Sequence, residues 1–125
     1  MLGPRVYAGM NMASQSPNRV FELRTYHAIP GKLDDLIDRF RDHTIELFNR
    51  HGLKVVGFWI PQDNKDNLLM YIIEHTSKEE GLNKWAAFQA DADWQEVKKA
   101  SEANGKLVDH IDRVFMDPAD FSPMK

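Results

Sequence analysis

The stretch LLMYII at residues 68–73 decides the fold of this chain, because it is apolar at every position. Six apolar residues suit a strand and fall far short of the roughly 18 that a membrane span needs. A strand with one face in water alternates apolar and polar side chains, and this stretch does not. We therefore expect a strand over residues 68–75 that is covered on both faces.

Three other segments complete the set of predicted strands. Residues 20–27 alternate between apolar and charged side chains with the period of two that is typical of a strand. Residues 54–60 contain the run VVGFWI and end at Pro61, and residues 108–116 end at Asp117-Pro118. The short polar turn between the strands at 54–60 and 68–75 predicts a hairpin.

Helices are predicted between these strands. Residues 32–51 carry one apolar stripe and are followed by Gly52, where a left-handed C-cap is expected. Ser77 and Glu80 have the spacing of a capping box, which predicts a helix from Lys78. Asp91 or Asp93 would then cap a third, shorter helix.

The resulting order is β-α-β-β-α-β with an extra helix before the last strand, which is the split βαβ pattern. It predicts an α+β, ferredoxin-like domain with a four-stranded antiparallel sheet and helices on one face. The chain has 125 residues and an apolar fraction of 42%, which is enough for one core. We expect a flexible tail over residues 1–18 and one domain over residues 19–125.

Helices on one face leave the other face of the strand at 68–75 uncovered, so the sequence predicts a homodimer. Burial of each Leu- or Ile-sized side chain is worth roughly 1.5–3 kcal/mol, against a total stability of about 5–15 kcal/mol. Exposing three such side chains together with Trp59 would remove much of that stability. The alternative is that the two tails of the same chain cover part of this face.

Composition excludes several classes of function. The chain has no cysteine, so disulfides, cysteine-rich zinc sites, iron–sulfur clusters and cysteine nucleophiles are absent. The formal net charge is −3 and no basic run stands out, which argues against nucleic acid as a partner. No apolar stretch is long enough for an integral membrane segment.

An ordered set of short motifs resembles the NIPSNAP family. The motifs are FELRTYH at 21–27, PGK at 30–32, VGFW at 56–59, EHTS at 74–77, WAAF at 85–88, DW at 93–94, MDP at 116–118 and FSP at 121–123. They extend over about residues 20–124. The family often has Asp-Pro before the second Trp, whereas this chain has Asp91-Ala92-Asp93-Trp94, which puts the local turn in doubt but not the fold.

The resemblance implies a dimeric α/β barrel, in which two sheets face each other and the helices lie outside. The family has no agreed enzymatic activity. Its eukaryotic relatives are mitochondrial, are tied to vesicle traffic or mitophagy, and have longer N-terminal regions. This short chain is more similar to stand-alone bacterial members, which implies a cytoplasmic location.

The first strand has one apolar and one polar face. The apolar face carries Phe21, Leu23 and Thr25, which we expect to pack on the helices. The polar face carries Glu22, Arg24 and Tyr26, which we expect to face the barrel interior. Charges in such a place must be paired, because an unpaired buried charge is costly.

In this fold the first and third strands are antiparallel neighbours, so Glu22 or Arg24 should approach Glu74 or His75. Sequence does not determine the register. One parity directs Tyr71 and His75 inward, and the other directs Met70 and Glu74 inward; Trp59 and Arg113 would complete the walls. The candidate pocket residues are therefore Glu22, Arg24, Tyr26, Trp59, Tyr71, Glu74, His75 and Arg113.

Two hypotheses about function follow. The first is a homodimer that binds a small apolar ligand or a protein partner in or around the barrel. The alternative is a cofactor-independent small enzyme, of monooxygenase or isomerase type, in which a histidine beside a carboxylate serves as general base in the polar pocket. A purely structural Glu–Arg–His network that sets the register of the dimer would explain the same residues.

No metal or cofactor is expected from the sequence. The five histidines show no compact ligand spacing, and His27 and His75 fall at opposite ends of the predicted sheet. A haem held by a single axial histidine would leave no sequence signature.

Overall fold

The computed structural model describes residues 18–125, so the tail expected at residues 1–18 lies outside the described residues except for Asn18. Its elements are β2 (Val20–Ala28), α1 (Leu33–Arg39), η1 (Phe40–Thr44), α2 (Ile45–Arg50), β3 (Lys54–Trp59), β4 (Leu68–His75), α3 (Lys78–Gln89), α4 (Ala92–Ser101) and β5 (Val108–Met116). In this part of the chain no helix has the length and apolar character that crossing a membrane requires.

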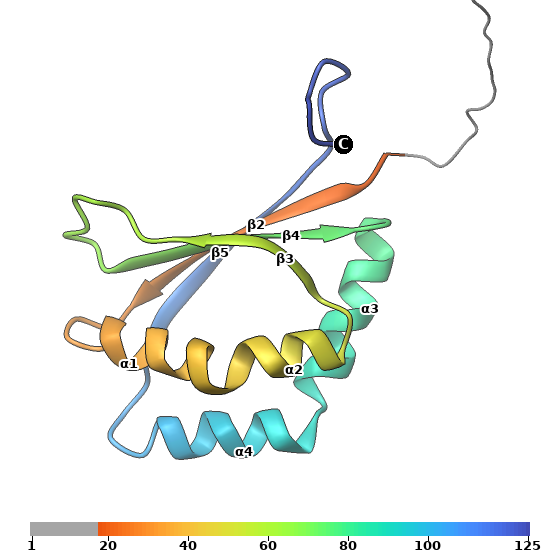
Figure 1. Ribbon diagram of the computed structural model, residues 1–125. Helices are drawn as coiled ribbons and strands as arrows, with labels where there is room; N and C mark the ends of the chain where they lie inside the picture. Colours follow the sequence, from red (N-terminus) through yellow and green to blue (C-terminus); the bar gives the residue numbers. More distant parts are fainter. Residues whose placement is uncertain (1–17) are drawn as a thin grey trace, which may run out of the picture.

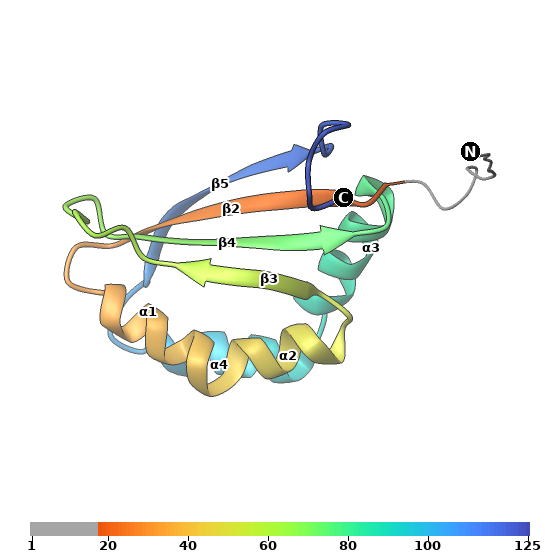
Figure 2. The same cartoon turned by 45° about the horizontal axis from the view of Figure 1, so that its top comes forward.

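The four strands form one antiparallel sheet in the order β3-β4-β2-β5, and the helices lie on one face of it (Figures 1 and 2). The ferredoxin-like α+β prediction is confirmed. β2 and β4 are central neighbours, with Val20 opposite His75 and His27 opposite Leu68. In the single chain the helices bury only one face of β4, the face that carries Leu69, Tyr71 and Ile73, whereas Met70 and Ile72 lie on the other face.

The first helical segment continues through a π-helical turn that periodicity alone did not reveal. α1, η1 and α2 follow one another without a break over the span predicted as one helix. In the π turn, the Thr44 hydroxyl donates a hydrogen bond to the carbonyl oxygen of Arg39 at 3.2 Å. The segment ends at Gly52, whose φ of 71° confirms the predicted left-handed cap.

The starts of α3 and α4 also follow local capping chemistry. The Ser77 hydroxyl accepts a hydrogen bond from the Glu80 amide at 3.0 Å, and the Glu80 carboxylate accepts one from the Thr76 amide at 2.9 Å. The capping-box prediction is thus confirmed, with the return bond displaced by one residue. For α4, the structure selects Asp91 over Asp93 as the cap, because the Asp91 carboxylate accepts from the Asp93 amide at 2.8 Å.

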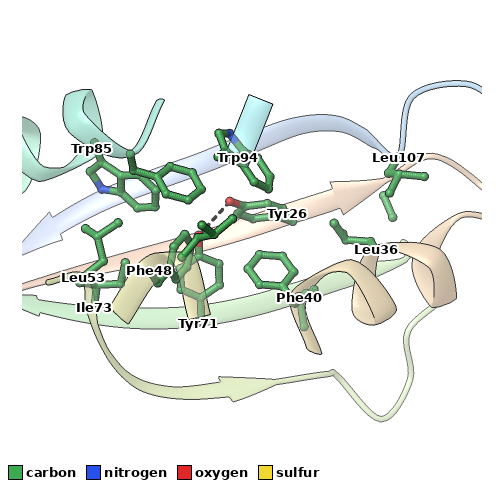
Figure 3. Close-up of a cluster of buried hydrophobic side chains, with 14 residues drawn as sticks. Tyr26, Leu36, Phe40, Phe48, Leu53, Tyr71, Ile73, Trp85, Trp94 and Leu107 are labelled. Carbon is green, nitrogen blue, oxygen red and sulfur yellow. Dashed lines mark hydrogen bonds between the residues drawn. The ribbon is translucent and has the colours of Figure 1, made fainter. Parts of the chain in front are cut away.

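The core lies between the sheet and the helices and is rich in aromatic side chains (Figure 3). Tyr26 and Tyr71 project from the sheet toward Phe40 and Phe48 of the first helical segment, with ring centroids 5.4–5.8 Å apart across these contacts. The two tyrosines contact each other through their hydroxyl oxygens at 2.8 Å. Such edge-to-face and tilted packing fills the layer and gives each tyrosine hydroxyl a polar partner.

The prediction that Glu22, Arg24 and Tyr26 face a barrel interior, away from the helices, is wrong. These side chains point toward the helices, where Glu22 is 0% exposed and Arg24 and Tyr26 are each 7% exposed. The prediction followed the polarity of these side chains, but their polar groups are satisfied under the helices. Glu22 and Arg24 pair with each other, the Trp85 indole donates to Glu22 and stacks on Arg24, and the Tyr26 ring packs on Phe40. Leu23 and Thr25 therefore lie on the opposite face.

We call that opposite side of the sheet the open face, defined by Leu23, Trp59, Met70, Ile72 and Val114. Trp59 is 50% exposed and Val114 is 51% exposed there. The C-terminal segment covers one end of this face, where Phe21 lies beside Met116, Pro118 and Met124 (Figure 1). The Arg19 guanidinium tethers this segment through the main-chain oxygen of Lys125 at 2.8 Å.

Candidate functional site

A buried polar cluster joins β2, β4 and α3. At its centre the Glu22 carboxylate accepts hydrogen bonds from His75 Nε2 at 2.7 Å, from Trp85 Nε1 at 2.8 Å and from Arg24 at 3.1 Å. The side chains of Glu22 and His75 are both fully excluded from solvent. Three donors from three elements therefore stabilise one buried carboxylate.

Gly81 of α3 makes the close approach of His75 to this cluster sterically feasible. A Cβ atom at position 81 would lie 2.8 Å from two atoms of the His75 ring. The first turn of α3 can therefore pack directly on the imidazole only with glycine there. Nδ1 of His75 has no hydrogen-bond partner within the described residues.

Arg24 extends the cluster toward the middle of the sheet. Its guanidinium donates to the Tyr71 hydroxyl at 2.8 Å and to the Tyr26 hydroxyl at 3.3 Å, and it stacks 4.0 Å from the centre of the Trp85 ring. A guanidinium carries five N–H donors, and with the bond to Glu22 three of these are used by described residues. Two donors of a nearly buried cation are left.

The pKa shifts of these groups have clear causes. Burial acts to raise the pKa of Glu22, but the hydrogen bonds from His75 and Trp85 and the charge of Arg24 outweigh it, so that pKa is lowered. Burial raises the pKa of Tyr71 well above 10, with a further contribution from Tyr26. At neutral pH the cluster therefore consists of a carboxylate, a guanidinium cation and a neutral phenol.

A cleft of about 310 Å³ opens beside this cluster, between the β2–β5 side of the sheet and the α3–α4 pair. Arg24 and Tyr26 form its sheet wall, and Trp85, Phe88 and Trp94 supply aromatic surface from the helices. Its remaining polar and charged lining residues are Arg39, Gln89, Lys98, Glu102, Lys106, Asp109 and His110. The cleft thus combines aromatic walls with several cationic side chains.

Arg39 contributes a second nearly buried cation to the cleft. It is 6% exposed, lies 5.1 Å from the centre of the Trp94 ring, and donates to the Ser101 hydroxyl at 3.1 Å. Glu102 is its carboxylate partner at 3.5 Å. Its Nε is buried and has no hydrogen-bond partner within the described residues.

The structure brings most of the predicted pocket residues together. Glu22, Arg24, Tyr26, Tyr71 and His75 form one connected network. The expected approach of Glu22 to His75 is confirmed. Tyr71 and His75 lie on the face of β4 that the helices cover, so the parity directed away from the helices is the one that carries Met70 and Glu74.

Three predicted residues lie at the margin or elsewhere. Arg113 reaches Glu22 at 3.7 Å from the partly exposed edge strand. Glu74 lies on the other parity and pairs with Arg19 at 3.1 Å and Lys54 at 3.3 Å. Trp59 lies on the open face, away from the cluster.

Sequence reasoning missed the role of the helices in this site. Neither Trp85 nor Arg39 is among the pocket residues predicted from the sequence. The sequence did contain a signal for them. An arginine or a tryptophan on the buried face of a helix needs a polar partner in the core, and such a partner would lie on the sheet.

Comparisons with known proteins agree with this fold. The sequence model of the NIPSNAP family matches residues 21–123. A crystal structure of a NIPSNAP family protein from Agrobacterium tumefaciens is 17% identical, covering 86% of this chain and 100% of that chain with a TM-score of 0.76. Another from the same organism, of unknown function, is 23% identical, with coverages of 86% and 95% and a TM-score of 0.75.

More distant structures share the same architecture. SnoaB from Streptomyces nogalater, described as a cofactor-independent oxygenase, is 16% identical, with coverages of 86% and 99% and a TM-score of 0.56. At this identity the likeness establishes the fold alone. No match was found among curated proteins.

Proposed function

Because this chain belongs to the NIPSNAP family, we propose that it works as a homodimer whose protomers each bind a small, mainly apolar molecule with an anionic group. The binding site is the cleft between the β2–β5 side of the sheet and the α3–α4 pair. The dimer interface is the open face. The location we infer is the cytoplasm, as for stand-alone bacterial members of the family.

One observation carries the binding proposal: Arg24 is a nearly buried cation on the wall of the cleft, with two N–H donors left over. A guanidinium held by aromatic and phenolic neighbours is preorganised to receive a carboxylate or a phenolate. Its fixed position means that little side-chain entropy is lost when a ligand binds.

The remaining lining defines the rest of the ligand. Aromatic side chains on the helical side favour a flat apolar body, and a volume of about 310 Å³ is at the small end of the range for ligand sites. Lys98 and Lys106 lie among the lining residues and add positive potential for an anion. Small aromatic or branched carboxylates fit this description better than neutral lipids or peptides do.

The exposure of apolar side chains on the open face supports the pairing of two copies through it. Trp59 and Val114 are each about half exposed in the single chain, and the C-terminal segment covers only the end of the sheet near Phe21. Contiguous apolar surface of this kind marks protein interfaces. A protein partner at the same face would compete with a second copy of the chain.

The ligand proposal is tested by a binding screen with two matched lysine variants. Nitrogen-resolved NMR spectra would be recorded with small aromatic carboxylates and with their neutral amides. Carboxylates should shift cleft amides and bind about tenfold more weakly to Lys98→Gln, which loses a cation beside the ligand. Lys99→Gln, which removes an exposed charge outside the cleft lining, should bind like the wild type.

Arg24→Lys tests directly whether the unused N–H donors of Arg24 bind the ligand. Lysine keeps the positive charge but lacks the planar guanidinium that can bind a carboxylate through two hydrogen bonds, so carboxylate affinity should fall about tenfold or more. Equal binding of carboxylates and amides, or unchanged affinity in both Arg24→Lys and Lys98→Gln, would overturn the proposal. Circular dichroism verifies that each variant is folded.

The second candidate function is a cofactor-independent enzyme that uses the same cleft. The meeting of Arg24 and the Tyr26 hydroxyl in one cavity favours it, as does the fold that the chain shares with SnoaB. Against it, Glu22 stays a carboxylate and Tyr71 stays protonated near neutral pH, so neither suits proton transfer there. Turnover of a bound ligand in air, lost in Tyr26→Phe, would put this candidate first.

A further inference from the structure

Two histidines and an aspartate meet at the end of the open face that the C-terminal segment leaves uncovered. His27 lies near the end of β2, directly opposite His110 of β5, and their rings stack with centroids 3.9 Å apart. His27 Nε2 lies 2.9 Å from the Asp112 carboxylate. One ligand atom from each of the three residues lies within 4.8 Å of the other two.

Strand geometry explains why these groups converge. His110 and Asp112 are two positions apart on β5, so their side chains leave the same face of the sheet. His27 is the cross-strand partner of His110, which places its side chain on that face as well. Since the backbone sets these positions, side-chain rotations alone are needed to turn the three groups toward one point.

A neighbouring carboxylate prepares His110 to act as a ligand. His110 Nδ1 lies 2.6 Å from the Asp109 carboxylate, and this hydrogen bond is the main reason that the pKa of Asp109 is lowered. With Nδ1–H donating to Asp109, the Nε2 lone pair of a neutral imidazole is free. A carboxylate on the second ring nitrogen is the usual support of a metal-bound histidine.

We propose that His27, His110 and Asp112 bind one divalent transition-metal ion of the Zn²⁺ class, with water in the remaining coordination position. Two imidazole nitrogens and one carboxylate oxygen are borderline donors that favour Zn²⁺, Co²⁺ or Ni²⁺ over Mg²⁺ and Ca²⁺. The site requires a single chain. It shares His110 and the supporting Asp109 with the lining of the cleft, but His27 and Asp112 lie outside that lining, so metal binding and carboxylate binding are measured independently and either proposal can fail alone.

Metal binding would replace an existing hydrogen bond. In this structure His27 Nε2 lies 2.9 Å from the Asp112 carboxylate. A neutral imidazole can carry its proton on Nδ1, so the Nε2 lone pair and the Asp112 carboxylate can both coordinate the ion. An ordinary surface pair of histidine and aspartate would show no saturable metal binding.

The test is a titration of the full chain, stripped with a chelator, with Zn²⁺ and with Co²⁺. We expect saturable binding of one ion per chain and a visible Co²⁺ absorption band. His110→Ala and Asp112→Asn should each weaken binding at least about tenfold, and Asp109→Asn should weaken it by a similar or smaller factor. His43→Ala, which removes an exposed histidine elsewhere, should bind like the wild type.

Each outcome decides the proposal. No saturable binding to the wild type, or binding that is equal in His110→Ala and the wild type, overturns it. Equal weakening in His43→Ala and His110→Ala points to scattered surface binding and overturns it as well. Selective shifts of the His27 and His110 ring nitrogens in NMR spectra of the Zn²⁺-loaded chain support it, with circular dichroism confirming that the variants are folded.

Discussion

At the scale of single residues, the most unusual feature is a charged carboxylate in the core, where burial of a charge is costly. Glu22 is fully buried, yet three donors reach it from β2, β4 and α3. Replacing one partner of such a network leaves the others unsatisfied, which costs more than the net value of any single bond. The cluster therefore fixes the position of α3 on the sheet.

Substitution of the central carboxylate should reveal this dependence. Glu22→Gln keeps the shape of the side chain but removes the charge opposite Arg24, so we expect the free energy of unfolding to fall by about 2–4 kcal/mol. Urea unfolding followed by tryptophan fluorescence measures the loss. Glu96→Gln, on the exposed side of α4, should change stability by less than about 0.5 kcal/mol.

The pH dependence of stability follows from the same group. The pKa of Glu22 is lowered in the folded chain from an ordinary value of 4.5, so unfolded chains bind more protons below that pH. Its contribution is fully present above about pH 4.5 and is lost as the pH falls through the folded-state pKa. Stability of the wild type should therefore fall more steeply below about pH 4.5 than that of Glu22→Gln. Parallel curves for the two proteins would contradict this assignment.

At the scale of elements, local sequence determines where helices start and stop, and a few contacts determine where they pack. The capping residues Ser77 and Asp91 act within their own turns. The seating of α3 instead depends on contact between Gly81 and His75, which belong to different elements. A glycine in a helix is normally unfavourable, and here its lack of a side chain is what the packing requires.

Gly81→Ala should therefore destabilise the protein despite the better helix propensity of alanine. The new methyl group would press on the His75 ring, which is held by Glu22, and overpacking of this kind costs about 1–3 kcal/mol. Denaturant unfolding and the His75 ring signals in NMR spectra report the effect. Asn83→Ala, at an exposed position of the same helix, should be neutral or slightly stabilising. Equal stability of the two variants would show that the helix can shift without cost.

At the scale of the whole molecule, the two faces of the sheet differ in how far they are buried. One face is buried under helices with its polar cluster and cleft, and the other is apolar and half exposed in the single chain. The proposed homodimer would cover that second face. Among the described residues, 18–125, no strand or helix lies over it (Figure 1).

The dimer is tested by a charge on each face of β5. Val114 lies opposite Leu23 on the open face, whereas Ile111 lies opposite Tyr26 on the helical side. Val114→Lys should convert the dimer to a folded monomer, because an unpaired charge would be buried at the interface. Ile111→Lys, also at a partly exposed aliphatic position, should remain dimeric. Sedimentation that finds the wild type monomeric, or both variants dimeric, would contradict the proposal.

Much of the fold could be predicted because it depends on neighbours along the chain. Period-two alternation located β2, and the limits of β4 and β5 coincide with the predicted segments. The π turn at Phe40–Thr44 was missed, since one extra residue in a turn hardly changes the pattern of apolar positions. In the site, the approach of Glu22 to His75 was predicted from strand order, but the partners on α3 were not.

The sequence by itself determined the elements, their order and the adjacency of β2 and β4, because periodicity, capping and chain connectivity are local or topological properties. Tertiary structure alone decided which face of β2 is buried: alternation shows that the two faces differ but not which one the helices cover. That choice depended on the Trp85 indole, which donates to Glu22 and stacks on Arg24. The meeting of His27 with His110 was decided in the same way, by pairing between strands far apart in the chain.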